Sequence, residues 1–216
     1  MQNMKTLLAA AVLAGTATSA AAAPITIDDF ASNPFNATLG AEGASDSDTS
    51  TLANGIVRSI LFERLANGGT VASGANSELS VSEGLLELAN DSNVDSQLTL
   101  SYDIDSLFDT NGITGFDLLV NNVGTSGDST VEALLNGTSL GIVTLGNGAN
   151  GEISFSFSDA VAAGNPDTLE FVFNGSPSYD LLIGPITADV PEPGALGLMG
   201  LGLLGVAAAS RRGRAA

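Results

Sequence analysis

The sequence of 216 residues contains no cysteine, no histidine and no tryptophan. Without cysteine there are no disulfides, so a domain of this size must be stabilised by its own apolar core. Without cysteine and histidine the chain cannot form a Ser-His-Asp or Cys-His catalytic arrangement, a histidine-ligated zinc site or a thiol redox pair. These absences exclude most hydrolytic and redox chemistries.

Basic residues are scarce as well, with 6 lysines and arginines against 24 aspartates and glutamates. Between residues 23 and 189 the only basic residues are Arg58 and Arg64, and all acidic residues except Glu192 lie there, so the formal charge is 2 minus 23, or −21. A field of this sign opposes binding to nucleic acid and to anionic lipid, and neither partner is expected. It favours a well-solvated surface, with divalent-cation binding by some carboxylates as the alternative.

The first 22 residues have the pattern of a secretory signal peptide. Lys5 precedes an apolar run, and a series of small residues follows that ends at Ala23. Ala20-x-Ala22 forms a small-x-small pattern, so we expect signal peptidase to cut after Ala22. Cutting one residue later would place Pro24 beside the scissile bond and is disfavoured. The mature domain is then expected to comprise residues 23–189.

The C-terminal segment, residues 190–216, has three parts. Val190-Pro191-Glu192-Pro193 comes first, an uncharged run from Gly194 to Ala209 follows, and Arg211, Arg212 and Arg214 complete the segment. A helix over this run would be about 24 Å long, slightly short of the ~30 Å hydrocarbon core of a bilayer. The arginines favour the cytoplasmic side, and the prolines favour an extended strip before the run.

This arrangement resembles the PEP-CTERM sorting signal. The features that carry the resemblance are Pro191-Glu192-Pro193, the Gly/Leu/Ala-rich run and the arginine cluster. The resemblance covers residues 190–216 only. It implies recognition by an exosortase, a membrane cysteine protease or transpeptidase of bacteria that make exopolysaccharide. It also implies a precursor held transiently in the inner membrane with a periplasmic ectodomain, which is then released or attached at the cell surface. An ordinary single-span anchor with a proline-containing linker is the alternative.

Residues 23–189 predict an all-β fold, an antiparallel β-sandwich of jelly-roll type. Ten or eleven short alternating stretches are separated by turns rich in Gly, Asn, Asp and Ser, without a persuasive helix. Glu83-Gly84 and Asn136-Gly137 predict hairpin turns, the latter because both of its residues tolerate positive φ. Residues 31–54 are expected to form a long surface loop that contains Asp46 and Asp48.

Two expectations concern individual strands. Gly55–Leu65 is expected to be a strand, whose Arg58 and Arg64 pair with surrounding carboxylates rather than with a ligand. The domain also resembles the β-sandwich domains commonly found before PEP-CTERM signals. This resemblance is carried by an opening strand, Thr26-Ile27-Asp28-Asp29-Phe30, and a closing strand, Tyr179-Asp180-Leu181-Leu182-Ile183. This resemblance carries no catalytic motif and implies only a sandwich fold and a surface module.

The candidate cation site consists of Asp103, Asp105, Asp109 and Asn111. Residues 103 and 105 of a strand project to the same face, and the following loop could bring the other two side chains back toward them. The resulting oxygen-rich pocket would suit Ca²⁺, with backbone carbonyls completing the coordination. A loop closed by Asx turns, with no metal, is the alternative.

Taken together, the sequence predicts an exported, non-enzymatic surface or extracellular-matrix protein, associated with exopolysaccharide or biofilm. No catalytic residue and no cofactor other than structural Ca²⁺ is expected. The alternative is a carbohydrate-binding, lectin-like module, for which Tyr179 at a strand edge is the candidate ligand residue. The chain has only two tyrosines and no tryptophan, and this scarcity weakens both the module and a glycosidase, since sugar-binding clefts usually expose such aromatics.

Overall fold

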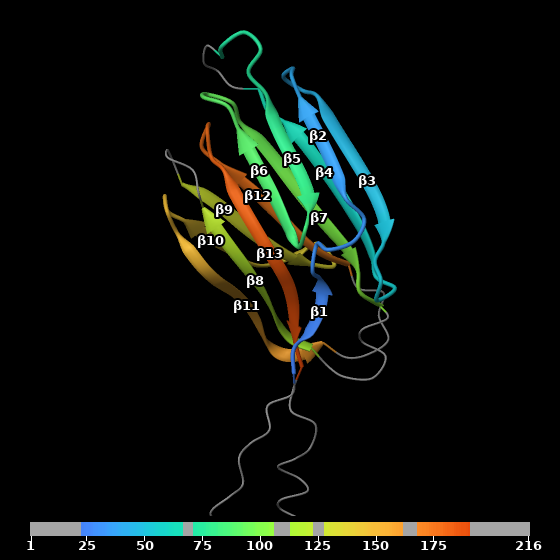
Figure 1. The fold of residues 1–216 in the computed structure, drawn as a ribbon. Coiled ribbons are helices and arrows are strands. Elements are labelled where there is room, and N and C mark those ends of the chain that lie inside the picture. Colours follow the sequence, from blue (N-terminus) through green and yellow to red (C-terminus); the bar gives the residue numbers. More distant parts are fainter. Residues whose placement is uncertain (1–22, 67–70, 106–112, 123–127, 162–167, 191–216) are drawn as a thin grey trace, which may run out of the picture. The chain divides into compact units, whose positions relative to one another are not determined.

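A computed structural model describes residues 23–66, 71–105, 113–122, 128–161 and 168–190. The described residues from Pro24 to Val190 form one compact unit, in which thirteen strands make two antiparallel sheets packed as a sandwich (Figure 1). Within these ranges no helix has the length and apolar character needed to cross a membrane. The expected signal peptide and the apolar run before the arginines lie outside the described residues. The predicted all-β sandwich is confirmed.

The larger sheet has seven strands, in the order β11-β8-β13-β6-β5-β2, with β1 also beside β13. Its strands are β1 (Ile25–Asp28), β2 (Phe35–Leu39), β5 (Ser77–Ser82), β6 (Leu85–Asn90), β8 (Ile113–Asn122), β11 (Asn150–Val161) and β13 (Leu181–Asp189). The last strand, β13, is central in this sheet. It pairs with β8 along one side, while β6 and β1 share its other side.

The smaller sheet has six strands, in the order β10-β9-β12-β7-β4-β3. Its strands are β3 (Ser45–Thr51), β4 (Val57–Arg64), β7 (Ser96–Asp103), β9 (Ser129–Leu135), β10 (Thr138–Leu145) and β12 (Thr168–Gly175). Alternation of side chains along the strands supplies the core, as predicted for β7, where Leu98, Leu100 and Tyr102 are fully buried. The two inner faces together form one apolar cluster.

Both predicted hairpin turns are confirmed. Glu83-Gly84 joins β5 to β6 with φ angles of 52° and 86°, and Asn136-Gly137 joins β9 to β10 with φ angles of 51° and 74°. Two consecutive positive φ angles are the signature of the type I′ turn, whose twist matches that of the strands it connects.

The prediction of a long loop over residues 31–54 is wrong, because β2 and β3 lie there. β3 is an edge strand that pairs only with β4. An edge strand with one face exposed to solvent does not need a continuous row of apolar side chains. Asp46 and Asp48 lie opposite Phe62 and Ile60, whose side chains are buried, so both carboxylates stand on the inner side of the edge. Inward-pointing charges of this kind discourage an edge from pairing with another chain.

Candidate functional site

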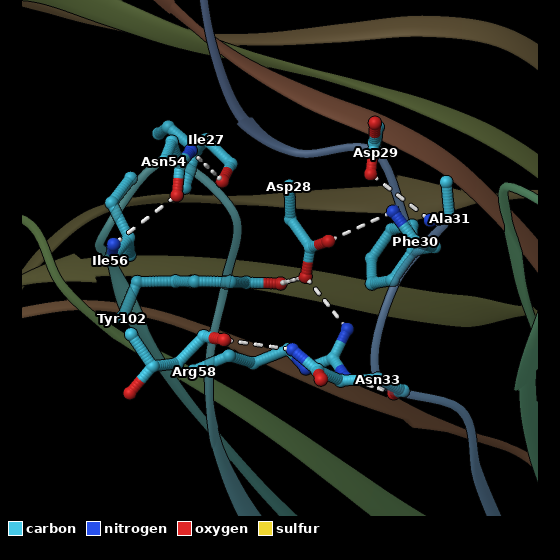
Figure 2. A network of polar contacts seen from close by, with 11 residues as sticks. Ile27, Asp28, Asp29, Phe30, Ala31, Asn33, Asn54, Ile56, Arg58 and Tyr102 are labelled. Carbon is cyan, nitrogen blue, oxygen red and sulfur yellow. Dashed lines mark hydrogen bonds and ion pairs between the residues drawn. The ribbon is translucent and has the colours of Figure 1, made fainter.

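A buried polar cluster joins the two sheets at the first strand (Figure 2). It consists of Asp28 on β1, Arg58 on β4 and Tyr102 on β7, so it links the seven-stranded sheet to the six-stranded one. Arg58 and Tyr102 have no exposed surface, and only 2% of Asp28 is exposed. A buried charge is tolerated only when it is paired and hydrogen-bonded, so the contacts of this cluster decide its role.

Asp28 accepts three hydrogen bonds. Its Oδ1 accepts from the backbone N–H of Phe30 at 2.8 Å, and its Oδ2 accepts from Nη1 of Arg58 and from the Tyr102 hydroxyl, each at 3.1 Å. Nη2 of Arg58 donates to the backbone carbonyl of Asn33 at 2.7 Å, and the guanidinium lies 5.9 Å from the centre of the Phe30 ring. The carboxylate and the guanidinium therefore neutralise each other inside the core.

The chain after β1 bends to make these contacts. Phe30 and Asn33 have positive φ angles of 53° and 56°, an uncommon conformation for residues other than glycine. Asn54 holds the other side of β1, since its Nδ2 donates to the carbonyls of Thr26 at 3.0 Å and Ile27 at 2.9 Å. β1 is thus fixed to the sandwich by side chains as well as by its short pairing with β13.

The cluster offers no accessible acid, base or nucleophile. Burial raises the pKa of the Tyr102 hydroxyl well above its usual value of 10, and the nearby Asp28 carboxylate raises it further. The phenol therefore stays neutral and acts as a hydrogen-bond donor. The arrangement ties β1 across the two sheets, and its chemistry is structural.

The two ectodomain arginines have different partners. The prediction that Arg58 pairs with a carboxylate is confirmed. For Arg64 the prediction is wrong, because its Nη1 donates to the backbone carbonyls of Leu39 at 3.1 Å and Ala75 at 2.6 Å. Both arginines are buried, so the surface of the described part of the chain carries carboxylates and no basic side chain.

The interpretation of Tyr179 as a ligand residue is wrong. Its ring is fully buried, its hydroxyl donates to the carbonyl of Ser96 at 2.8 Å, and its own carbonyl accepts from Nδ2 of Asn90 at 2.8 Å. A Cβ placed on Gly175 would lie 2.6 Å from the ring, so glycine is needed there for close packing. Tyr179 anchors the start of β13 in the core and is unavailable for stacking on a sugar.

Only half of the predicted Ca²⁺ site lies in the described ranges. Asp103 and Asp105 are exposed, and the backbone N–H of Asp105 donates to Oδ1 of Asp103 at 3.3 Å, as in an Asx turn. Asp109 and Asn111 lie outside the described residues. Among the residues that the structure does describe, no three acidic side chains are grouped to hold a metal, and the Ca²⁺ site stays a prediction.

A group of carboxylates that sequence reasoning missed lies at the end of β13. Asp189 is the last residue of this strand and pairs with Gly115 of β8, two positions from Asp117. Burial raises the pKa of Asp189 most. The nearby charge of Asp117, a side-chain hydrogen bond with Asp117, and the charge of Glu152 on β11 raise this pKa further. A Cβ on Gly115 would lie 3.2 Å from Oδ2 of Asp189 and 2.8 Å from the carbonyl of Phe155, so glycine leaves room for this strand end.

Val190 follows Asp189 directly and is the last described residue. The other predicted sorting residues lie outside the described residues; they are Pro191, Glu192, Pro193, Gly194, Arg211, Arg212 and Arg214. The described part of the chain therefore ends at Val190, the first residue of the predicted sorting signal, directly after a strand that is paired on both sides.

Comparison with solved structures finds sandwiches of low similarity. The CBM4 structure shares 12% identity at a TM-score of 0.37, covering 60% of this chain and 86% of that one. The family 11 carbohydrate-binding module of Lic26A-Cel5E from Clostridium thermocellum shares 12% at 0.34, covering 79% and 96%. The CBM22-1 xylan-binding domain of Paenibacillus barcinonensis Xyn10C shares 9% at 0.32, covering 80% and 99%.

In a comparison of sequences, no curated protein matches the chain significantly. The family model of the PEP-CTERM protein-sorting motif matches residues 189–212, which confirms the resemblance of the C-terminal segment. The motif implies an exported protein with an exosortase as its processing partner. The chain is therefore an exported protein that carries a PEP-CTERM protein-sorting motif, and the motif begins at the last residue of its β-sandwich.

Proposed function

We propose that this protein is a non-enzymatic module of the cell surface or extracellular matrix, delivered by exosortase processing and associated with exopolysaccharide or biofilm. The observation that carries the proposal is the junction at Asp189. This residue ends β13 and begins the sorting motif, so no linker separates the two. Cleavage beyond Asp189 would leave every strand intact, and the sandwich itself would be the displayed product.

The pairing of β1 with β13 supports the same reading. Ile25 lies opposite Ala188 and Thr26 opposite Thr187 in antiparallel register. The two ends of the sandwich, Pro24 and Val190, therefore leave it side by side. Both processing events would act at one end of the domain, and its faces and its far end would be free for contact with the matrix.

The composition of the chain and the burial of its best-formed polar cluster support a non-enzymatic role. The chain has no histidine or cysteine, and the best-formed polar cluster of the described residues is closed to solvent. Both tyrosines are buried and tryptophan is absent. Neither residue type is available to stack on a sugar, so a lectin-like module is the weaker hypothesis. The binding experiment below tests it.

The sorting part of the proposal is tested by two variants expressed in a strain that contains an exosortase. We expect Glu192→Ala and deletion of Arg211–Ala216 to leave the precursor in the inner membrane, as would loss of the exosortase. Glu78→Ala, on an exposed position of β5, is the matched control and should be sorted normally. Normal surface display of both variants would contradict the proposal.

The molecular role is tested on the processed protein purified from the cell surface. We expect it to leave exopolysaccharide of the same strain uncut, with no new reducing ends after prolonged incubation. Saturable binding to one glycan that survives high salt would favour the lectin-like module instead. Release of oligosaccharides would contradict a non-enzymatic role.

A further inference from the structure

The strand β10 ends the six-stranded sheet, and in the described part of the chain it pairs only with β9 (Figure 1). An edge strand presents a row of unpaired backbone N–H and C=O groups, which can pair with a strand of another chain. Proteins protect such edges by keeping them short, by charged side chains, by proline or by bulges. The outermost strands of the two sheets are β2, β3, β10 and β11, and they differ in these protections.

Three of these outermost strands are protected by length or by charge. β2 is only five residues long. β3 has Asp46 and Asp48 on its inner side, and β11 contains Glu152 and Asp159. In contrast, β10 contains neither a charged residue nor a proline, and no charged residue occurs anywhere from Ala133 to Gly151. β10 is therefore a neutral edge on a strongly acidic domain.

A bulge near the beginning of β10 limits the part of the strand that can pair. Leu140 is an extra residue between Ser139 and Gly141, which lie opposite consecutive residues of β9. A bulge disrupts the ladder locally. The regular stretch that is left for a further strand is Gly141–Leu145.

Within this stretch, Ile142 and Thr144 direct their backbone N–H and C=O groups away from β9. Asn136, the residue after β9, donates its N–H to the carbonyl of Thr168 on β12 at 2.8 Å. Even-numbered residues of β9 therefore bond toward β12 and odd-numbered ones toward β10. The residues of β10 opposite the odd-numbered ones are Gly141, Val143 and Leu145. The side chain of Ile142 is also 63% exposed, so both its backbone and its side chain are accessible.

We propose that β10 is the interface of a dimer, in which it pairs with β10 of a second copy of this chain. The two strands run antiparallel about Val143, which lies opposite Val143 of the second copy on the two-fold axis. Ile142 then lies opposite Thr144 of the second copy, and each such pair exchanges both N–H···O bonds. The exposed side chain of Ile142 is covered in the same step.

Electrostatics favours self-pairing at β10 over self-pairing at β3. Glu132 of β9 lies opposite Ile142. In the dimer the two copies of Glu132 are at least three strand spacings apart, about 14 Å, which exceeds the Debye length of about 8 Å at physiological ionic strength. Self-pairing of β3 would instead bring Asp46 and Asp48 of the two copies to within about 5 Å of one another. Two acidic copies can therefore meet along β10.

The same arrangement makes the association stop at two copies. A two-fold contact uses the same strand of both copies, so β10 is consumed on each side. The other edge of this sheet is β3, where the inward carboxylates of Asp46 and Asp48 oppose a further strand. We therefore expect a closed dimer rather than a fibre. This inference does not depend on the proposed function.

Sedimentation equilibrium tests the dimer on the chain recovered from outside the cell, with its C-terminus identified by intact mass. The result then does not depend on where an exosortase cuts. We expect the average mass to rise from one copy to two between about 5 and 500 μM, a range suited to a small interface, and to stop there. A mass of one copy at all concentrations would overturn the inference, and so would continued growth beyond two copies.

Two variants locate the contact. Thr144→Pro removes an outward N–H and leaves the hydrogen bonds to β9 in place, and Ile142→Glu adds a carboxylate to the neutral edge. Each should raise the dissociation constant at least about tenfold, without a change in far-UV circular dichroism. Leu61→Glu is the matched control, because Leu61 is 40% exposed on the outer face of the same sheet; it should dimerise normally. Unchanged dimerisation of Ile142→Glu would overturn the inference even if Thr144→Pro did not fold.

Because the chain contains no cysteine, a single introduced cysteine gives a further test. In the proposed register the Cα atoms of residue 143 in the two copies lie about 4.5 Å apart, a separation that a disulfide can bridge. Under mild oxidation Val143→Cys should form a covalent dimer at least about tenfold faster than Ser47→Cys, on the exposed β3 edge. Equal rates for the two variants would contradict the proposed register.

Discussion

Replacement of Asp28 by alanine should be among the most destabilising single changes in this protein. The variant leaves the guanidinium of Arg58 in the core without its carboxylate, and it removes the acceptor of the Tyr102 hydroxyl and of the Phe30 N–H. Removing one partner of a buried ion pair costs roughly 3 to 5 kcal/mol. A single domain is stable by about 5 to 15 kcal/mol, so the variant should lose a large part of its free energy of unfolding.

The measurement is urea denaturation at pH 7, followed by far-UV circular dichroism. Asp29→Ala is the matched control, because this neighbouring carboxylate is exposed and accepts only the N–H of Ala31; it should cost about 1 kcal/mol or less. The double variant Asp28→Ala/Arg58→Met removes both charges and should recover part of the loss. Equal stability of Asp28→Ala and Asp29→Ala would refute the reasoning, as would a double variant that loses the sum of the single losses.

Three further predictions concern other parts of the sandwich. Gly175→Ala should cost about 1 to 3 kcal/mol in urea denaturation, because the new methyl group overlaps the Tyr179 ring; an unchanged midpoint would contradict this packing. Burial raises the pKa of Tyr102 and Tyr179, so the stability that these tyrosines confer is complete below about pH 10 and is lost as the pH rises above it. Phenolate absorbance should therefore rise only as the circular dichroism of the folded protein is lost. Titration of these tyrosines near pH 10 in the folded protein would contradict their burial. Replacing Asp46 and Asp48 together by valine should increase aggregation, measured by light scattering, because inward charges protect the β3 edge from pairing with another chain. The control variant carries valine at Ser47 and Thr49 instead. Equal aggregation of the two variants would contradict this role of the aspartates.

Features encoded by local patterns could be predicted from the sequence. The alternation of β7 places Leu98, Leu100 and Tyr102 in the core, and Asn136-Gly137 adopts the turn that this pair favours. The sorting motif is likewise a contiguous pattern, so it is recognised without knowledge of the fold. In each case the information lies within one contiguous stretch of chain.

Features that depend on distant partners could not be predicted. Tyr179 looked like an exposed aromatic because its acceptor, Ser96, is 83 residues away in sequence. Arg64 finds backbone carbonyls rather than a carboxylate because the fold brings two other segments over it. β3 was missed because an edge strand with solvent on one side can consist of serine, aspartate and threonine.

The carboxylates near Asp189 illustrate the same limit. Asp117, Glu152 and Asp189 lie on three different strands and share no sequence motif. Only the order β11-β8-β13 brings them to one region of the sheet.

The intact mass of the protein recovered from outside the cell tests exosortase processing of the displayed sandwich most directly. We expect a chain that begins at Ala23, retains β13 through Asp189 and has lost the uncharged run and the arginines after Pro193. A recovered chain that still carries Arg211 to Arg214, or one cut at or before Asp189 within the last strand, would contradict it.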